Sequence, residues 1–527
     1  MIKTDIKVPF SYSSDDIFSA LSLRLPVGRE ELKELRILKR TLNISDKSNI
    51  HYDLTVGISL SAEREAGLLK MKKKVKPMDG LSFSIPNCIF TDRPVVVGAG
   101  PAGLFAALLL AEASAKPILL ERGLDVDERT KKVEMFNKFS ILDTECNVQF
   151  GEGGAGTFSD GKLKVGSLDK YKYKVLSDFV SAGAPEDILY TVGAHVGTDK
   201  LQNIVKKLRQ KIISLGGEVL FSTRLTSLTI KDGELVGCVA EHNGEQIDFS
   251  TNTVVLATGH SARDVFSLLK ESGAALEAKG FGIGLRIEHP REYIDSLVYG
   301  NNAPDGIGAA SYHLVTHLPN GRSVYSFCMC PGGSVVAATS EQGGIVTNGM
   351  SEYARNADNS NAAFLVSVTP ADFGSDDALA GIELQRQIER AAFTVAGGNY
   401  RAPATSMEAF MNRADPHISS VKPSYPIGTE LMSPESYLPR YITDSIRAAI
   451  PDFDAWMKGF YYPDAAMTGP ETRTTSPVRV LRGRDFEAVG IKGLYPAGEG
   501  AGYAGGIVSS ARDGLMVAEA IIEKYKI

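Results

Sequence analysis

The sequence predicts an α/β protein in which a Rossmann-like domain is interrupted by an inserted mixed α+β domain and preceded by a small α+β domain. Three observations carry this prediction. A buried strand runs into a glycine-rich turn at residues 95–103, strand and helix patterns alternate from residue 199, and the alternation resumes at residue 493. Such alternation is typical of a parallel sheet covered by helices. The long stretch between these segments has a different pattern and predicts the inserted domain.

The first 88 residues are predicted to form the small N-terminal domain. Residues 15–23 have a helical pattern, and residues 36–43 and 51–60 read as strands. The basic run KMKKKVK at residues 70–76 follows them. We interpret this run as a solvated linker, with contact to a phosphate or a membrane surface as the alternative.

Residues 95–103 read VVVGAGPAG, and each glycine has its own use. The valines predict a buried strand, and Gly98 allows the tight turn that leaves it. Gly100 lets a pyrophosphate approach the backbone, and Gly103 lets the helix predicted at residues 104–113 lie close to the sheet. The N-terminus of that helix offers free amides and the positive end of its dipole to phosphates.

A second strand, at residues 117–120, ends at Glu121, which lies 18 residues beyond Gly103. A carboxylate there can accept hydrogen bonds from a ribose diol, and its charge disfavours a 2′-phosphate. Strand, glycine turn, helix, second strand and terminal acid together predict a dinucleotide site.

The remaining Rossmann-like segments define the expected domain boundaries. A helix at residues 199–215 precedes strands at 218–228, 234–241 and 252–259, and a late strand (493–497) and helix (506–525) close the fold. The block between them contains mixed strands and isolated helices, such as the one at 378–395. The predicted division is 1–88 for the N-terminal domain, 89–264 for the first part of the cofactor domain, 265–465 for the inserted substrate domain and 466–527 for the C-terminal part.

Composition narrows the class of protein. The 527 residues suffice for about three domains, and 43% of them are hydrophobic and 23% charged. The net charge of −6 argues against a nucleic-acid footprint over the whole protein. Five cysteines, without a metal-type C-x-x-C pair, favour a reducing compartment. We therefore expect a cytoplasmic protein with no membrane span and no metal site.

Two further elements identify the dinucleotide as FAD. The strand at residues 254–256 ends in Ala257-Thr258-Gly259, which resembles the ATG element of FAD-binding oxidoreductases. The run GLYPAGEGAGYAGGI at residues 493–507 resembles the element that places an acidic residue beneath the flavin ribityl chain, and Glu499 occupies that position. The helix that follows could point its dipole at the flavin pyrimidine.

The chain resembles the two-domain FAD oxidoreductases of the glutathione-reductase superfamily. It is most similar to an uncharacterised bacterial family of FAD-dependent, or NAD(FAD)-utilizing, dehydrogenases. The motifs that carry the narrower resemblance lie at residues 150–163 (FGEGGAGTFSDGKL), 257–264 (ATGHSARD), 281–290 (FGIGLRIEHP), 325–333 (YSFCMCPGG), 346–351 (VTNGMS) and 471–479 (ETRTTSPVR). The resemblance implies the fold and the cofactor but no substrate, because a fold does not fix a function.

The glycine-rich run at residues 151–162 is expected to be a loop whose amides, with Thr157, Ser159 and Lys162, reach the flavin or its phosphates, rather than a structural turn alone. The complete set of expected cofactor-binding residues is Gly98, Gly100, Pro101, Ala102, Gly103, Glu121, Arg122, Gly123, Thr157, Ser159, Lys162, Leu225, Ala257, Thr258, Gly259, Gly498, Glu499, Gly505, Gly506 and Ile507.

The sequence does not fix the catalytic residues, and the candidates are Arg473, Lys162 and Cys330. Arg473 either holds an anionic substrate or the reduced flavin, or forms a structural ion pair. Cys328 and Cys330 suggest a redox disulfide, but residues two apart on a strand lie near the upper limit for bridging, so we interpret them as packing residues.

Four further residues admit a structural and a functional interpretation. Arg286 and Glu288 share one face of an alternating segment and His289 points to the other. We favour a buried pair that braces the sheet over a substrate contact. For His260, just after the ATG element, we favour a cap of local backbone over a position near the cofactor.

These observations together predict an FAD-dependent oxidoreductase that moves a hydride between flavin N5 and a small organic substrate. A flavin monooxygenase is one alternative. An RNA-associated flavoprotein is another, suggested by the N-terminal domain and the basic run, although no nucleic acid partner is expected. The chain has one complete dinucleotide fold, so NAD(P)H enters only as a transient electron donor or acceptor at the flavin face. The oligomeric state stays open.

Overall fold

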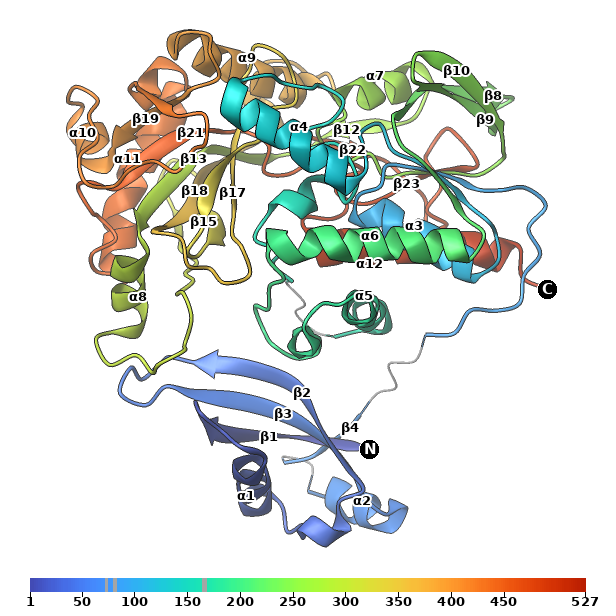
Figure 1. Cartoon of the computed structure of the whole chain (residues 1–527), viewed down its shortest axis with the longest axis vertical. Helices are drawn as coiled ribbons and strands as arrows, with labels where there is room; N and C mark the ends of the chain where they lie inside the picture. The colour runs from blue at the N-terminus through green and yellow to red at the C-terminus, as the bar shows by residue number, and fades with distance from the viewer. Residues whose placement is uncertain (72–73, 79–82, 164–167) are drawn as a thin grey trace.

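The computed structural model describes residues 1–71, 74–78, 83–163 and 168–527 (Figure 1). A small N-terminal unit lies beside a larger body, and the body contains a parallel sheet and a separate, mainly antiparallel sheet. This arrangement confirms the predicted fold class. Residues 72–73 of the basic run lie outside the described residues, so the interpretation of that run as a linker stays a prediction.

The N-terminal unit is a four-stranded sheet with two helices on one face (Figure 1). Its elements are β1 (Ile2–Pro9), α1 (Ser14–Arg24), β2 (Glu34–Asn43), β3 (His51–Ser59), α2 (Ala62–Leu69) and β4 (Lys76–Pro77), with strand order β2-β3-β1-β4. Alternate residues of β1, such as Ile2 and Ile6, are buried in its core. The predicted helix and both predicted strands are confirmed. Strand β1 was not predicted from the sequence.

One edge of this unit is joined to the body through Arg40 of β2. Its amide donates to the carbonyl of Tyr190 (2.7 Å), and its own carbonyl accepts from Val192 (2.9 Å). Its guanidinium pairs with Asp187 at 2.8 Å. Lys47, in the β2–β3 connection, also donates to the carbonyl of Leu297 at 2.9 Å. The N-terminal unit is therefore docked on the body by backbone and side-chain bonds.

A five-stranded parallel sheet forms the centre of the body, in the order β23-β11-β5-β6-β7. Its strands are β5 (Val95–Val97), β6 (Ile118–Leu120), β7 (Glu218–Leu220), β11 (Val254–Leu256) and β23 (Leu494–Pro496). The helices of this part of the chain are α3 (Pro101–Glu112), α4 (Val126–Phe139), α5 (Lys170–Ser181), α6 (Thr198–Ser214) and α12 (Ile507–Lys524). A Cβ on Gly514 of α12 would lie 2.1 Å from the carbonyl oxygen of Ala102, so glycine permits the close crossing of α12 and α3.

An antiparallel meander extends from this sheet. It consists of β8 (Thr223–Lys231), β9 (Glu234–His242) and β10 (Glu245–Ser250). The single strand predicted at residues 218–228 is in fact two strands, β7 and β8, because Ser222 adopts a left-handed φ of 50° and turns the chain. Helix α7 (Arg263–Glu271) follows β11, and β12 (Leu276–Ala278) pairs with β22 (Val478–Val480) where the chain enters and leaves the inserted domain.

The inserted domain is built on a seven-stranded sheet in the order β14-β15-β18-β13-β21-β19-β20. The strands are β13 (Phe281–Pro290), β14 (Val315–His317), β15 (Ser323–Cys330), β18 (Asn359–Val368), β19 (Ala402–Ser406), β20 (Thr429–Leu431) and β21 (Ala466–Glu471). A hairpin of β16 (Ser334–Ala337) and β17 (Thr347–Met350) and the helices α8 (Arg291–Tyr299), α9 (Ala380–Val395), α10 (Met407–Asn412) and α11 (Arg440–Trp456) complete it. The expected boundary after residue 465 falls at the start of β21, so this sheet extends to Glu471.

These two sheets meet where the site forms. Because β5, β6, β11 and β23 are parallel, their carboxyl ends share one edge of the central sheet. The ends of β15, β17 and β21 from the inserted sheet and its hairpin line the same cavity as that edge. Within the described part of the chain, no helix is both long enough and apolar enough to cross a membrane.

Candidate functional site

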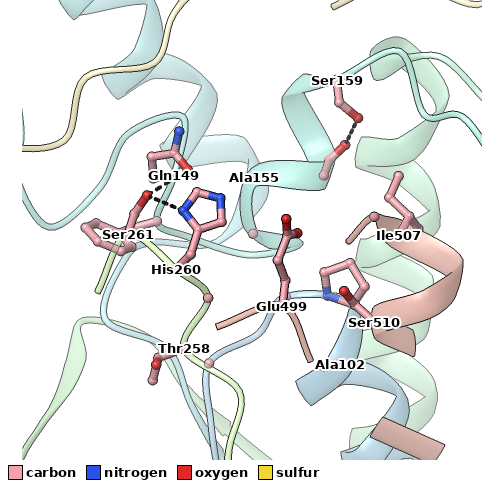
Figure 2. A pocket seen from close by; sticks show the side chains of 18 of the residues that line it. Ala102, Gln149, Ala155, Ser159, Thr258, His260, Ser261, Glu499, Ile507 and Ser510 are labelled. Carbon is pink, nitrogen blue, oxygen red and sulfur yellow. Dashed lines mark hydrogen bonds between the residues drawn. The ribbon is translucent and has the colours of Figure 1, made fainter. Parts of the chain in front are cut away.

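A long cleft runs from the first glycine turn to the inserted sheet. Figure 2 shows part of its wall from close by. Its walls come from segments that are far apart in the sequence: the β5–α3 turn, the end of β6, the loop at 149–162, the start of β8, the turn after β11, the end of β15, β17, the segment after β21 and the start of α12. Most of the residues that the sequence predicted to bind a cofactor line this one cavity.

The β5–α3 turn has the geometry that its glycines predict. Gly98 has a φ of 100°, and a Cβ there would lie 2.4 Å from the carbonyl oxygen of Ala257. A Cβ on Gly103 would lie 1.8 Å from the carbonyl oxygen of Gly98, so glycine allows α3 to approach the turn. Near Gly100 the nearest atom to such a Cβ is 3.8 Å away, which leaves its backbone accessible from the cleft. The amides of Ala102 and Gly103 have no acceptor within the helix.

Glu121 lines the cleft but already has three protein partners. Its carboxylate accepts hydrogen bonds from the amides of Ala99 (2.7 Å), Gly123 (2.9 Å) and Gly151 (2.9 Å), and the residue is 5% exposed. One carboxylate therefore holds the β5–α3 turn, the turn after β6 and the glycine-rich loop together. The sequence predicted a ribose ligand and missed this second, structural use of the side chain.

The glycine-rich loop is shaped by a buried arginine that sequence reasoning missed. Arg129 of α4 is fully buried and donates to the carbonyls of Asn147, Val148, Gly151 and Glu152 at 2.6–3.2 Å. Burial lowers the pKa of its guanidinium to about 10. No local motif marks this arginine, because its four acceptors are backbone oxygens 18–23 residues away.

Four of the expected cofactor-binding residues do not line the cleft. Gly103 and Gly123 pack against neighbouring backbone, and Gly498 donates its amide to Asp513 at 2.7 Å. The Thr157 hydroxyl turns inward and donates to the carbonyl of Glu152 at 3.2 Å. The sixteen others lie along the cavity wall, including Arg122, Ser159, Lys162, Leu225 and Thr258.

Glu499 is the acidic residue of the cleft that has no hydrogen-bond or ion-pair partner among the described residues. Figure 2 shows its side chain pointing into the cavity between His260 and Ile507. Burial raises the pKa of its carboxyl to about 7, and the nearby Lys279 opposes this shift. A Cβ on Gly505 or Gly506 would have no atom within 4 Å, so the wall beside the start of α12 is open backbone.

His260 lines the cleft beside the ATG element. Its Nδ1 lies 3.3 Å from the hydroxyl of Ser261, which in turn contacts the side chain of Gln149 (Figure 2). Burial, followed by the charges of Arg473 and Arg263, lowers the pKa of this imidazole to about 3. The ring is therefore neutral at physiological pH and interacts with side chains rather than capping local backbone.

Arg473 lines the cleft as part of a buried ion-pair cluster. Its Nε and Nη2 donate to Glu389 at 3.0 and 2.9 Å, and Nη1 donates to the hydroxyl of Ser340. Arg263 of α7 donates to both oxygens of the same carboxylate, at 3.0 and 2.8 Å. The two arginines hold the pKa of Glu389 well below its usual range. This cluster joins α7, α9 and the segment after β21, and only Arg473 of it was a sequence candidate.

The predicted pair of Arg286 and Glu288 is wrong, although both residues are buried in β13 with His289. Arg286 pairs with Glu471 (3.1 Å) and Asn361 (2.6 Å) instead. Glu288 accepts from Ser424 and Asn359 and does not contact Arg286. The adjacent strands β18 and β21 supply the partners of Arg286, because side chains that face the same way on one strand meet the neighbouring strand more closely than each other.

Cys328 and Cys330 both line the cleft, at a bulge in β15. Cys328 has a φ of 38°, and the pairing of β15 with β18 shifts register between Phe327 and Cys330. The two cysteines are free, and the Cys330 thiol donates to the carbonyl of Cys328 at 3.2 Å. Burial raises the pKa of the Cys328 thiol to about 12 and also raises that of Cys330. Both side chains are therefore neutral thiols.

Lys162 also faces this end of the cleft. Its ammonium lies 3.8 Å from Asp160, which is bound by both Nε (2.9 Å) and Nη2 (2.5 Å) of Arg355. Burial lowers the pKa of this lysine. Arg355 belongs to the inserted domain, 195 residues from Asp160, and nothing in the sequence linked the two.

The residues present fit FAD. The cleft is long and is lined by open glycine backbone at two helix N-termini, α3 and α12, which suit a pyrophosphate and a flavin ring. Between them Glu499 offers a carboxylate without a protein partner, as a chain of ribityl hydroxyls requires. Arg122 and Leu225 line the cavity beside the end of β6, where a nucleoside would lie.

Comparisons with known proteins agree with this fit. A model described as "FAD binding domain" matches residues 126–281, and one described as "FAD-dependent protein, C-terminal domain-like" matches residues 280–474. A protein of Clostridium beijerinckii (strain ATCC 51743 / NCIMB 8052), designated "Uncharacterized protein", is 45% identical over 511 residues, which is 95% of each chain.

Solved structures overlap the fold more loosely. The E. coli quinol fumarate reductase FrdA E245Q variant is 15% identical, with a TM-score of 0.35 over 83% of this chain and 70% of its own. A 3-ketosteroid-delta4-(5alpha)-dehydrogenase from Rhodococcus jostii RHA1 is 14% identical, with a TM-score of 0.35 over 83% and 99%. Both scores lie below 0.5, and neither structure supports a functional conclusion here.

Fold, site and the two family models define an FAD-dependent oxidoreductase, with FAD as its cofactor. Within that class the chain belongs to the family of the C. beijerinckii protein, since the identity of 45% extends over nearly all of both sequences.

Proposed function

We propose that the protein oxidises or reduces a small organic molecule held between FAD and the inserted sheet. The observation that carries the proposal is the single cleft in which the glycine turn, Glu499 and the bulge at Cys328 line one continuous wall. When bound there, FAD supplies hydride exchange at its N5 atom. The chain supplies binding, orientation and exclusion of water.

We assign cofactor roles according to position along the cleft. The open backbone at Gly100 and the amides at the start of α3 would hold the pyrophosphate. The free lone pairs of Glu121 would accept from the adenosine ribose, while the three bound amides fix the direction of its carboxylate. Glu499 would accept from a ribityl hydroxyl, and the start of α12 would face the flavin.

The ion-pair cluster of Arg473, Arg263 and Glu389 is buried, and Arg263 also donates to the partly exposed Glu341 at 2.8 Å. We propose that Arg473, which lines the cleft, stabilises negative charge that develops on the flavin or the substrate, and that Glu389 holds Arg473 in place for this purpose. Cys328 and Cys330 pack as neutral thiols in this proposal, since burial raises the pKa of both groups.

We further infer membership of the glutathione-reductase superfamily and a cytoplasmic location. The parallel five-stranded sheet followed by a three-stranded meander supports the first inference. Five free cysteines support the second, because such thiols persist in reducing compartments.

The first test is the cofactor of the purified protein. We expect flavin absorbance bands near ~450 and ~370 nm that bleach with dithionite, and release of FAD rather than FMN on denaturation. A colourless protein that does not take up added FAD would refute the proposal. With FAD bound, anaerobic mixing with candidate organic substrates should bleach or restore the band at ~450 nm when the substrate is correct.

The same measurement tests the electron donor. The complete dinucleotide fold is assigned to FAD, so we expect NADH or NADPH alone to reduce the flavin slowly, with an apparent affinity of roughly millimolar. To measure this rate, the protein is mixed anaerobically with each nucleotide and the decrease of the flavin absorbance band is recorded. Fast reduction that saturates at micromolar nucleotide would contradict this expectation and indicate an NAD(P)H-dependent reductase.

A further inference from the structure

The end of the cleft beside the inserted sheet has an unusual balance of charge. Its two acidic side chains, Asp160 and Glu471, each have an arginine partner. The guanidinium of Arg473 is likewise matched by Glu389. Lys162 is the one cation on this part of the wall, among the described residues, whose nearest acid, Asp160, is bound more closely by another cation. This imbalance in charge indicates a class of substrate, and the inference about that class rests on the proposed function.

The isolation of Lys162 follows from how Asp160 is held. Both Asp160 oxygens accept from Arg355, at 2.9 and 2.5 Å, and its carboxylate is 3.8 Å from the Lys162 ammonium. Arg355 is fixed in a left-handed conformation with a φ of 49°. Its carbonyl oxygen would lie only 1.8 Å from a Cβ on Gly332, so the backbone on both sides is closely packed. Asp160 is therefore committed to Arg355 and compensates Lys162 weakly.

The remaining groups near Lys162 add no negative charge. The sulfur atoms of Cys328 and Cys330 are close enough to interact electrostatically with this lysine, but burial raises the pKa of both thiols and keeps them neutral. Glu471 is matched by Arg286 at 3.1 Å. The Lys162 ammonium is only 20% exposed, and its nearest acid lies 3.8 Å away and is bound by Arg355. Such an ammonium is poorly stabilised and favours an anionic ligand.

The same wall offers a neutral donor and an apolar surface. The side-chain oxygen of Asn348 accepts from the amide of Gly349 at 2.8 Å, and its NH2 group donates to none of the described residues. Gly349 lies against Arg286, whose Nη2 also binds the carbonyl of Cys328 (2.9 Å), so Asn348 belongs to the same wall as the bulge. Phe327 and Met329 supply carbon surface there.

We propose that this end of the cleft binds the carboxylate of a small organic acid, with the Lys162 ammonium as its counter-ion and the apolar wall in contact with its carbon chain. A carboxylate matches one ammonium and one amide donor, and it brings the single negative charge that this wall lacks. Lys162 is then a substrate-binding residue and does not bind the cofactor.

The test is a titration of the FAD-loaded protein with butanoate, followed by the change in the flavin absorbance spectrum. Butanamide, of nearly the same shape but uncharged, and inorganic sulfate are titrated in parallel. We expect saturable perturbation by butanoate, binding at least about tenfold weaker for butanamide and sulfate, and binding about tenfold to hundredfold weaker for butanoate in Lys162→Met. Lys206→Met, on the surface of α6 and paired with Asp127 at 2.7 Å, is the matched control and should bind like the wild type.

Two further variants test the same idea without removing the lysine. Asp160→Asn deletes the weak competing acid, so butanoate should bind as tightly as in the wild type or more tightly. Arg355→Met frees Asp160 to pair with Lys162, so butanoate should bind at least about tenfold more weakly. Thermal melting of each variant separates loss of binding from loss of fold. Should Arg355→Met fail to fold, Asp160→Asn and Lys162→Met still decide the matter.

The outcomes separate this inference from the proposed function. A protein that holds FAD but shows no butanoate perturbation, or one in which Lys162→Met binds butanoate normally, overturns the inference alone. Loss of FAD from Lys162→Met with the fold intact would overturn it too, since the lysine would then hold the cofactor. Sulfate binding as tightly as butanoate would overturn the organic-acid class. Absence of FAD from the wild type would instead refute the proposed function.

Discussion

The two ends of the cleft are built in different ways. At the nucleotide end, backbone amides of short glycine turns line the wall, and single side chains such as Glu121 and Arg129 hold those turns over separations of 2–30 residues. At the inserted-sheet end, buried side-chain pairs line the wall, such as Arg286 with Glu471 and Arg355 with Asp160, over 185 and 195 residues. The nucleotide end is therefore largely a local structure. The substrate end depends on pairs between distant segments, and one of them, Arg355 with Asp160, joins the two domains.

The largest effect should come from Arg129→Met at the nucleotide end. It removes the buried guanidinium that donates to four backbone carbonyls, and we expect a loss of about 3–5 kcal/mol in the free energy of unfolding together with loss of FAD. Chemical denaturation of the FAD-free protein and the flavin content after purification measure the two effects. The control Lys131→Met removes an exposed lysine of the same helix and should cost less than about 0.5 kcal/mol. If the Arg129→Met variant is stable and retains FAD, the glycine-rich loop does not need the Arg129 guanidinium to keep its shape.

Glu121→Gln should have the next-largest effect, because glutamine offers one acceptor oxygen at a position where three amides donate. We expect the free energy of unfolding without FAD to fall by about 1–3 kcal/mol, and FAD to bind more weakly. Urea denaturation and FAD titration of the apoprotein measure the two quantities. Glu128→Gln, on the exposed side of α4, is the control. Weaker FAD binding with unchanged stability would mean that the ribose contact dominates and the three backbone bonds contribute little.

Glu499 lies between the two ends and should make stability depend on pH. Its folded-state pKa is raised from 4.5 to about 7 by burial, so the folded protein holds a proton that the unfolded chain releases between these values. Stability therefore falls as pH rises through this window, and Glu499→Gln should remove about 1–3 kcal/mol of that fall in the FAD-free protein. Urea denaturation at pH 5 and pH 8 measures the difference. Parallel pH profiles for mutant and wild type would contradict the shift.

The smallest effect should come from the cysteines at the inserted-sheet end. Cys328→Ser and Cys330→Ser, singly or together, should leave the number of electrons taken up by the FAD-loaded protein at two per flavin, because neutral packed thiols take no part in redox chemistry. Anaerobic dithionite titration counts the electrons. Four electrons in the wild type that fall to two in the double variant would show a redox disulfide and make this end reactive in its own right.

Particular elements show where sequence reasoning succeeded. The helix and strands predicted at residues 15–23, 36–43 and 51–60 appear as α1, β2 and β3, and the segments around the first glycine turn appear as β5, α3 and β6. Hydrophobic periodicity and glycine spacing act within one element, so a linear pattern records them. The strand predicted at 218–228 failed at Ser222, where a single left-handed residue breaks the strand without a glycine or proline signal.

The residues of the site also fall into two groups, those that a sequence motif indicates and those that only the folded structure identifies. Gly98, Gly100, Glu121 and Glu499 could be chosen from the sequence because their motifs are short. Arg129, Glu389 and Arg355 could not, because each acts on partners that only folding brings near. The pairing of Arg286 and Glu288 was predicted wrongly for the same reason: the alternation of one strand says which face a side chain shares, and the neighbouring strand decides what it meets.

The sequence by itself determined the Rossmann-like fold, the dinucleotide turn and the identity of FAD. Each of these depends on short motifs whose residues are adjacent or one helix apart. The tertiary structure alone decided which charges are matched, that Glu121 braces three loops, and that the acid nearest to Lys162 is bound more closely by another cation. The physical reason is that electrostatic balance is a property of distances in space, and burial by a second domain sets both those distances and the dielectric in which the charges act.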